Sequence, residues 1–210
     1  MTTIIGIQGD GFCIAASDSR LSETEADSNL ISQIVGLRES NGKLAANGKF
    51  ILGAAGDLRA INILHHAFKP PEPAPNLKGK KLDQFITVKF IPALRECFEH
   101  NGYASPDNDQ KEHIAEHSST VFVAINGQIY IIDGDYSWVS DSNGMFAIGT
   151  GAQYALGAMY ALLPNKGKIS SLGLARKMVL KGLAAAAKFD PYTGAPYHTY
   201  MQGKDKEKSK

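Results

Sequence analysis

Thr2 is the first residue of the chain whose type and position suggest chemistry. Met1 is often removed when a small residue follows it, and its removal would give Thr2 a free α-amine beside its hydroxyl group. Such an amine can act as the base that activates the hydroxyl as a nucleophile. Many proteins begin with Met-Thr, so Thr2 alone indicates little. The interpretation depends on the residues that the fold brings to it.

Four later segments carry polar or glycine residues at points where a predicted strand or helix ends. They are Asp18-Ser19-Arg20, Gly53-Ala54-Ala55-Gly56-Asp57, Gly149-Thr150-Gly151 and Asp190-Pro191-Tyr192-Thr193-Gly194. Each has a simple structural interpretation when taken alone. Asp18 could cap a strand, Thr150 could cap a helix, and Asp190 with Thr193 could form an Asx turn. Their joint occurrence and order are therefore more informative than any single segment.

The strands expected to position these residues are short and joined by tight turns. Residues 2–8 and 12–20 form the first predicted hairpin, with Gly9-Asp10-Gly11 as its turn. Two Asn-Gly pairs, Asn47-Gly48 and Asn126-Gly127, predict hairpins between residues 43–46 and 49–55 and between residues 118–124 and 128–133. Further short strands are expected at 30–35, 145–148 and 196–201.

The helices are expected in two pairs. Helical spacing of apolar residues predicts helices from Gly56 to Phe68 and over 82–101, the second kinked or divided by Pro92. The other pair covers 152–163 and, after a cap at Ser170 or Ser171, 172–188. The proline-rich residues 69–81 predict an exposed loop. Strand and helix blocks segregate along the chain, which favours an α+β fold of stacked layers.

Length and composition narrow the class of protein. The 210 residues predict one domain, 2–202, followed by a charged, disordered tail, 203–210. The chain is 43% hydrophobic and 20% charged, and its net charge of +1 gives no electrostatic reason to expect nucleic acid or an anionic membrane as a partner. No apolar run reaches the ~20 residues that a membrane-spanning helix needs, and no signal peptide is visible. A cytoplasmic protein is expected.

Cysteine and histidine residues give no strong sign of a disulfide or a metal. Cys13 and Cys97 lie in apolar surroundings and are expected to be free thiols. His113 and His117 have the i, i+4 spacing of a metal-binding pair on a helix, but no third ligand is suggested nearby. Surface histidines are the simpler interpretation, and no metal is expected.

The four segments, taken in order with Thr2 directly after Met1, resemble the motifs of β-type proteasome subunits and bacterial proteasome-like peptidases. These proteins belong to the N-terminal-nucleophile hydrolase superfamily, and the resemblance covers most of residues 2–202. It implies a four-layer αββα sandwich, which the predicted α+β block order fits. It also implies a threonine peptidase that needs no cofactor and cleaves peptides or unfolded proteins inside a homo-oligomeric ring. An ATPase unfoldase is a further partner that the resemblance admits.

The resemblance implies roles for three residues near the start of the chain. Thr2 matches the nucleophile that attacks the scissile carbonyl, with its α-amine as the proton acceptor. Asp18 matches the acidic partner of a lysine that eases deprotonation of the threonine, and Lys43 is the candidate for that lysine. Lys43 lies slightly closer to Gly56 than the family lysine does, and a one-residue shift in a strand turns a side chain to the opposite face. Arg38 is the only other cation close by.

The later segments receive roles in the same way. Asp190 and Thr193 match an aspartate and a serine that support the threonine amine, and Thr150 stands where the family usually has a serine. Gly56 matches the glycine whose backbone N–H serves the oxyanion hole. Ala54 matches a residue that lines the pocket for the side chain before the cleaved bond, so this pocket should be roomy and apolar.

Two other functions are compatible with the same fold. The chain could be a non-catalytic ring or scaffold subunit, as proteasome-type α subunits are, or an amidase that acts on a small molecule. Thr2 together with Asp18 favours catalysis over scaffolding. The preference for peptides over small amides rests on the resemblance alone.

Overall fold

The first two strands form an antiparallel hairpin in which almost every side chain is buried. The structure, a computed structural model, describes residues 2–24, 31–36, 42–74, 76–103, 116–163 and 169–203. Strand β1 is Thr3–Gln8 and strand β2 is Phe12–Asp18, and Ile4 pairs with Ser17. The turn between them holds Gly11 at a φ of +83°, a backbone conformation that glycine adopts without strain. The predicted first hairpin is confirmed, except that its second strand ends at Asp18 instead of Arg20.

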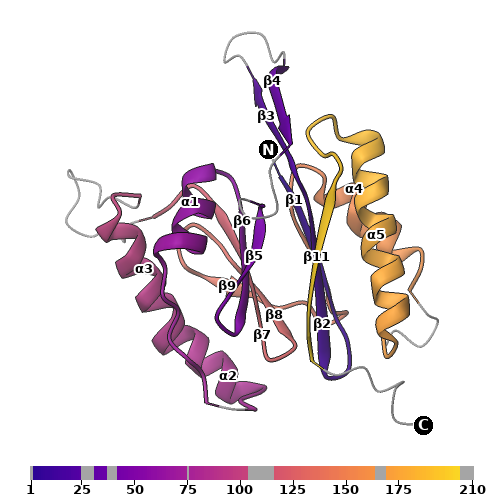
Figure 1. Cartoon of the computed structure of the whole chain (residues 1–210). Coiled ribbons are helices and arrows are strands. Elements are labelled where there is room, and N and C mark those ends of the chain that lie inside the picture. The colour runs from indigo at the N-terminus through magenta and orange to yellow at the C-terminus, as the bar shows by residue number, and fades with distance from the viewer. Residues whose placement is uncertain are drawn as a thin grey trace.

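This hairpin is the centre of a four-stranded antiparallel sheet. Its strand order is β10-β1-β2-β11, where β10 is Met145–Gly149 and β11 is Tyr197–Gly203. A separate two-stranded ribbon, β3 (Arg20–Thr24) with β4 (Ile31–Gly36), extends from the end of β2 (Figure 1). Gly203, predicted to begin the tail, closes β11, and the rest of the predicted tail lies outside the described residues.

The second sheet is five-stranded and entirely antiparallel, in the order β5-β6-β7-β8-β9. Its strands are β5 (Leu44–Asn47), β6 (Phe50–Ala55), β7 (Thr120–Ile125), β8 (Gln128–Ile132) and β9 (Trp138–Val139). The hairpin at Asn126-Gly127 is confirmed, and both residues have positive φ as a two-residue turn of this kind requires.

The turn predicted at Asn47-Gly48 is wrong by one residue. Asn47 pairs with Phe50 as the last residue of β5, so the turn is Gly48-Lys49. The side-chain amide of Asn47 donates hydrogen bonds to the carbonyl oxygens of Leu64 and Phe68, at 2.8 and 2.9 Å. These bonds tie the end of β5 to the π-helical turn η2 and to Phe68 directly after it.

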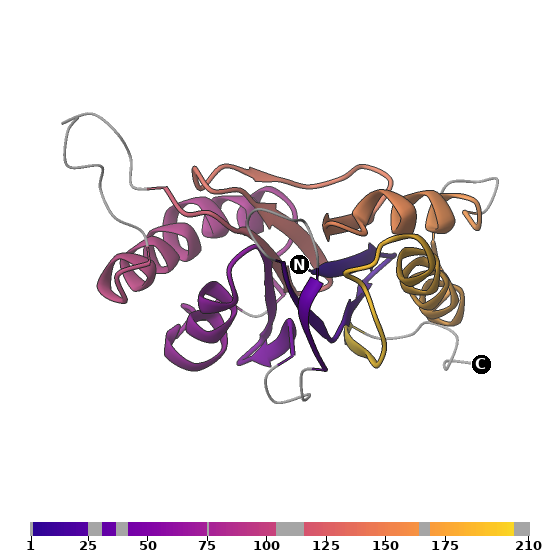
Figure 2. The same cartoon turned by 90° about the horizontal axis from the view of Figure 1, so that it is seen from above.

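The helices lie on the two outer faces of the paired sheets. One face carries α1 (Leu58–Asn62), η2 (Ile63–Ala67), α2 (Lys80–Phe85), η3 (Ile86–Phe90) and α3 (Ile91–His100), where η marks a π-helical turn. The other face carries α4 (Ala152–Tyr160) and α5 (Leu172–Phe189), which Ser171 caps through its hydroxyl. Figures 1 and 2 show both sheets between these two groups of helices.

Two helix predictions need correction in detail. The helix expected from Gly56 begins at Leu58, because Gly56 has a φ of +134° and the Asp57 carboxylate caps the helix by accepting the Arg59 N–H. The division predicted at Pro92 takes the form of a change of helix type within residues 80–100. The π-helical turn η3 ends at Phe90 and α3 begins at Ile91, so Pro92 lies in the first turn of α3, where a missing backbone N–H is tolerated.

Three buried apolar layers hold the sandwich together. The outer two lie between each sheet and its helices, and the middle layer lies between the sheets. Fully buried members include Leu52, Leu64 and Phe90 on the α1–α3 side, Ile4, Leu44 and Phe122 in the middle, and Ile5, Met159 and Leu183 on the α4–α5 side. The predicted four-layer αββα sandwich is confirmed.

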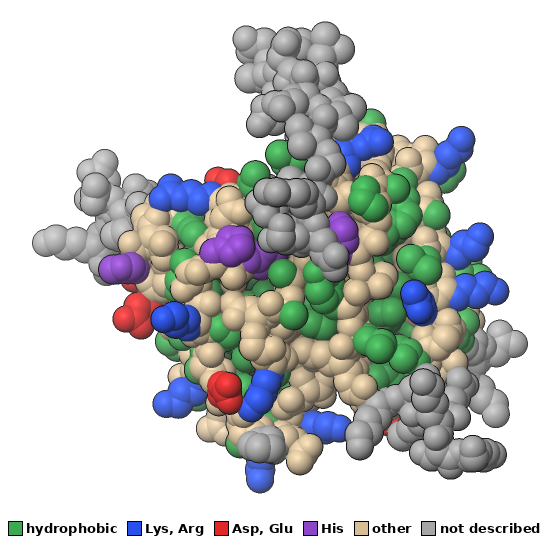
Figure 3. Space-filling model, viewed as in Figure 1, with side chains coloured by type: hydrophobic (Ala, Val, Ile, Leu, Met, Phe, Trp, Pro, Cys, Tyr) green, Lys and Arg blue, Asp and Glu red, His purple; other side chains and the backbone are tan. Residues whose placement is uncertain are grey.

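The surface seen in Figure 3 has apolar side chains gathered over β11 and α5, with Lys and Arg side chains around its margin. Within the described residues, no helix is long and apolar enough to cross a lipid bilayer.

Candidate active site

Thr2 and Thr3 are held in place at the end of β1 that meets the β3–β4 ribbon. Thr2 is 4% exposed and Thr3 is completely buried. The carbonyl oxygen of Thr2 accepts a hydrogen bond from the Thr150 N–H at 2.9 Å. Gly149, with a φ of +92°, packs its backbone directly against this carbonyl, and a side chain at position 149 would collide with it. The first residues of the chain are therefore fixed against the end of β10.

Asp18 is the centre of a buried ionic group next to Thr2. Its Oδ1 accepts hydrogen bonds from the Thr3 N–H at 2.9 Å and from Lys43 Nζ at 2.7 Å. Its Oδ2 accepts from the backbone N–H groups of Arg20 and Gly194, both at 3.1 Å. A completely buried carboxylate needs such donors, because an unpaired charge in the interior is very costly. Asp18 thus joins the first strand, the Lys43 region and the last loop.

Lys43 is as deeply buried as its partner. It lies one residue before β5, is 1% exposed and forms an ion pair with Asp18 across the gap between the two sheets. Burial lowers the pKa of the Lys43 ammonium below its ordinary value, and the negative charge of Asp18 opposes this shift. The other candidate cation, Arg38, lies outside the described residues.

Asp190 organises a second polar network on the helix side of β1. Its Oδ2 accepts the hydroxyl protons of Thr150 at 2.7 Å and Thr193 at 2.6 Å, and its Oδ1 accepts the Tyr192 N–H at 3.1 Å. The Asx-turn interpretation of Asp190 is therefore correct, but the carboxylate also does more than stabilise a turn. The suggestion that Thr150 caps a helix is wrong, because the cap of α4 is Gly151 and the Thr150 hydroxyl is bound to Asp190 instead.

Thr3 connects this network to the first strand, and sequence reasoning missed it. The Thr3 and Thr193 hydroxyl oxygens are 2.6 Å apart, and the Gly151 N–H donates to Thr3 Oγ1 at 3.1 Å. Because Thr193 donates its proton to Asp190, the Thr3 hydroxyl donates to Thr193. The signal was available, since consecutive residues of a strand face opposite sides of the sheet. If Thr2 faces the gap between the sheets, Thr3 must face the loops beside α4 and α5.

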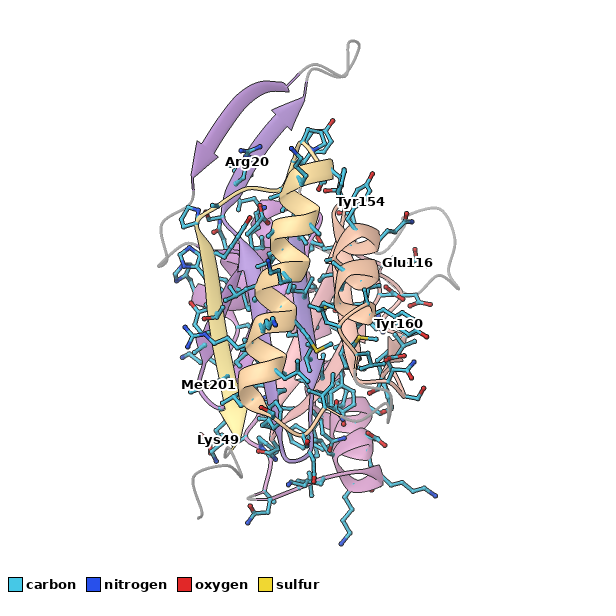
Figure 4. The ribbon with its side chains drawn as sticks, turned by 90° about the vertical axis from the view of Figure 1, so that its right-hand side faces the viewer. Arg20, Lys49, Glu116, Tyr154, Tyr160 and Met201 are labelled. Carbon is cyan, nitrogen blue, oxygen red and sulfur yellow. The ribbon has the colours of Figure 1, made fainter. Side chains whose placement is uncertain are left out.

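Arg20 also belongs to the frame of the site. Its guanidinium Nη1 donates to the Pro191 carbonyl oxygen at 2.8 Å, and the side chain packs where a Cβ on residue 194 would otherwise sit. Figure 4 shows Arg20 at the base of the β3–β4 ribbon, at the same end of the molecule as Tyr154, while Met201 and Lys49 lie at the opposite end. The last loop is thus clamped onto the start of β3.

The glycine turn after β6 stands apart from both networks. Ala54 is completely buried in β6, where it packs in the apolar layer under α1–α3. Gly56 is exposed at the end of this strand, at a φ that side-chain-bearing residues rarely adopt. Its backbone N–H can therefore be approached closely by a ligand's backbone.

Metal binding has little support in the described ranges. No group of three or more His, Cys, Asp or Glu side chains in them could hold an ion. His117 is buried among aromatic rings and not at the surface as expected, and His113 lies outside the described residues.

No protein-family model matches the chain, and no curated protein matches it in sequence. Solved structures are nevertheless similar over almost its whole length. Thiobacillus denitrificans BPH in complex with epoxomicin has a TM-score of 0.71 at 20% identity, covering 96% of this chain and 98% of that one. HslV from Trypanosoma brucei has a TM-score of 0.60 at 17% identity, covering 97% and 100%. The Anbu Gly-1 mutant from Hyphomicrobium sp. strain MC1 has 0.63 at 17%, covering 98% and 83%.

These similar structures are relatives of the proteasome-type threonine peptidases. The resemblance inferred from the sequence motifs is therefore confirmed at the level of the fold.

Proposed function

We propose that this chain, which has the fold of proteasome-type threonine peptidases, is itself a threonine peptidase whose nucleophile is Thr2 after removal of Met1. One observation carries the proposal: Thr2 lies between two buried polar networks. Its carbonyl is bound to Thr150, whose hydroxyl is bound to Asp190, and the next residue, Thr3, is bound to the Asp18 that holds Lys43.

In the proposed reaction, Thr2 Oγ1 forms a bond to the scissile carbonyl carbon while its proton passes to the α-amine of the same residue. The positive charge of Lys43 favours the developing alkoxide, and Asp18 keeps that ammonium charged and oriented. The Gly56 N–H donates to the oxyanion of the tetrahedral intermediate. Collapse of this intermediate breaks the peptide C–N bond, and the leaving amine takes the proton from the α-ammonium.

An ester between Thr2 and the acyl half of the substrate remains. Water, with the α-amine again as base, hydrolyses this ester and restores the free hydroxyl. Asp190, Thr150 and Thr193 would hold the region of the amine. Ala54, which is completely buried under α1–α3, would lie beneath the pocket for the residue before the cleaved bond. This pocket should accept large apolar side chains.

The finer assignments follow from the same proposal. Residues 2–202 would act as one peptidase domain in the cytoplasm, within a homo-oligomeric ring that admits peptides or unfolded proteins. An ATPase unfoldase would be the partner that supplies such substrates. No cofactor takes part in the proposed chemistry.

The decisive experiment measures the intact mass of the purified protein before and after treatment with a peptide epoxyketone. The proposal expects a mass without Met1 and one adduct, located at Thr2 by peptide mapping, that disappears in Thr2→Ala. A retained Met1 with no adduct would instead favour the non-catalytic scaffold. Cleavage of small amides without cleavage of fluorogenic peptides would favour the amidase.

A further inference from the structure

Ser119 touches the turn that holds Gly56, although it lies 62 to 63 positions later in the chain. The Asp57 N–H donates a hydrogen bond to Ser119 Oγ at 3.0 Å. A Cβ on residue 56 would lie only 2.5 Å from the same oxygen, so Ser119 fills the space beside Gly56 that a side chain would occupy. Ser119 is 3% exposed, and water therefore does not compete for this contact.

The turn needs such a support because of its own residue type. The peptide before Gly56 is held by the pairing of Ala55 with Thr120 in the sheet. The peptide after Gly56 is outside the sheet, and glycine has little resistance of its own to rotation about φ and ψ. The hydrogen bond from Asp57 to Ser119 fixes that second peptide. Gly56 is thus held between a strand on one side and Ser119 on the other.

Ser119 is in turn held by its own neighbours. Tyr103, just after α3, places its hydroxyl oxygen 2.6 Å from Ser119 Oγ. The Tyr103 ring packs edge-on against Phe98 of α3, with 5.0 Å between ring centroids. The backbone N–H of Ser119 donates to His117 Nδ1 at 3.4 Å. The support of the turn therefore extends to a rigid aromatic group on α3.

We infer that Ser119 is a positioning residue for the oxyanion-binding turn, and that Tyr103 acts through it. The inference rests on the proposed role of the Gly56 N–H. Ser119 does not touch substrate. It holds the Cα of Gly56 and the Gly56–Asp57 peptide in place. The preceding Ala55–Gly56 peptide, which carries the Gly56 N–H, is therefore fixed at both ends, and this N–H stays aimed at the developing oxyanion, which matters more in the transition state than in substrate binding.

The test compares four variants of the full-length protein on a fluorogenic peptide. We expect Ser119→Ala to lower kcat by about tenfold or more with KM within about twofold, a smaller loss than the ~10²–10³ of removing an oxyanion donor itself. Ser119→Thr, which keeps the hydroxyl, should recover most of kcat. Tyr103→Phe should show an intermediate loss, and Ser170→Ala, at an exposed serine just before α5, should match the unaltered protein.

A second measurement separates this inference from the proposed function. Amide hydrogen exchange at Asp57 should become faster by about tenfold in Ser119→Ala and return in Ser119→Thr, whether or not the protein is active. Faster exchange in a protein that shows no Thr2 chemistry would retain the turn support and reject the peptidase. An active Ser119→Ala with unchanged kcat, or unchanged exchange at Asp57, would overturn the inference. If Ser119→Ala fails to fold, Tyr103→Phe and Ser119→Thr decide by the same two readouts.

Discussion

Lys43 Nζ lies 2.7 Å from Asp18 Oδ1, and neither side chain is more than 1% exposed. This buried ion pair joins the two sheets beside Thr2. Removing one partner of such a pair leaves an uncompensated charge in the interior, whereas removing both charges is often nearly neutral. Single and double substitutions of this pair can therefore separate its contribution to stability from its contribution to catalysis.

Lys43→Met should reduce peptidase activity by at least ~10²-fold and destabilise the protein by about 3–5 kcal/mol, because Asp18 loses its counter-charge. The double variant Asp18→Asn/Lys43→Met should regain much of the lost stability without regaining activity. Urea unfolding and kcat measured on both variants and on the unaltered protein give the comparison. A Lys43→Met protein with near-normal kcat would remove Lys43 from the mechanism.

The pH dependence of the rate should also report on Lys43. Its folded-state pKa is lowered from the ordinary 10.5, first of all by burial, so the ammonium loses its proton at a lower pH than an exposed lysine does. The decrease of kcat at alkaline pH should therefore have its midpoint below pH 10.5. At pH values between the folded-state and the unfolded-state pKa of Lys43, the unfolded chain binds more protons than the folded chain. The free energy of unfolding that Lys43 contributes therefore rises with pH in that window.

Lys43→Arg is the control for this assignment, because a guanidinium keeps its charge at high pH. Its residual activity should persist to higher pH even if kcat is reduced. An identical alkaline limb in both proteins would assign the loss of activity to another group.

Thr3→Val should weaken the hydrogen-bond network around Asp190, to which the Thr3 hydroxyl belongs through Thr193. The change keeps the shape of the side chain but leaves the Gly151 N–H and the Thr193 hydroxyl short of one partner each. We expect a cost of about 1–3 kcal/mol in the free energy of unfolding, together with a lower kcat. Thr3→Ser should be much milder. Thr199→Val, at an exposed position of β11 in the same sheet, is the matched control and should leave both quantities unchanged.

Buried histidines should make the protein less stable in mild acid. Burial lowers the pKa of His117 and of His65 below 6.5, and Asp133 and Asp135 only partly oppose this at His117. The unfolded chain then binds more protons than the folded one just below pH 6.5, so the free energy of unfolding should decrease as pH falls through that region. Urea unfolding between pH 7.5 and 5 should show the decrease.

His117→Gln should flatten this dependence, and His100→Gln, at the exposed end of α3, should not. The slope with pH is the quantity to compare, since His117→Gln can lower stability at every pH. Equal slopes in all three proteins would contradict the assignment to His117.

Local patterns predicted the elements well where one chemical requirement dominates. The Asn126-Gly127 turn needs positive φ at both positions, and few other residues supply it. At Asn47-Gly48 the same pattern predicted the turn one residue too early. The Asn47 amide binds the carbonyl oxygens of Leu64 and Phe68, and the sequence does not show these partners. Pro92 correctly marks the point where η3 ends and α3 begins, but the sequence did not show that the chain stays helical on both sides of that point through a π-helical turn.

The order of the motifs predicted which residues would lie near one another at the end of β1, while the residues that support them were missed for a physical reason. Thr3, Arg20 and Ser119 act through hydrogen bonds to backbone groups of segments far away in the chain. Such bonds require only one donor or acceptor at the right place, so they leave no pattern of spacing or composition. Lys43 could be named as a candidate beside Arg38 but not chosen over it from the sequence, because strand register is a property of the whole sheet.

Asp18 receives the N–H of Gly194, 176 positions further along the chain. A growing polypeptide would expose its leading threonine early in synthesis, long before that loop leaves the ribosome. Until the final segment has been synthesised, Asp18 lacks its hydrogen bond from Gly194 and Arg20 lacks its hydrogen bond to Pro191. The proposed site would thus stay incomplete until translation of the chain is almost finished.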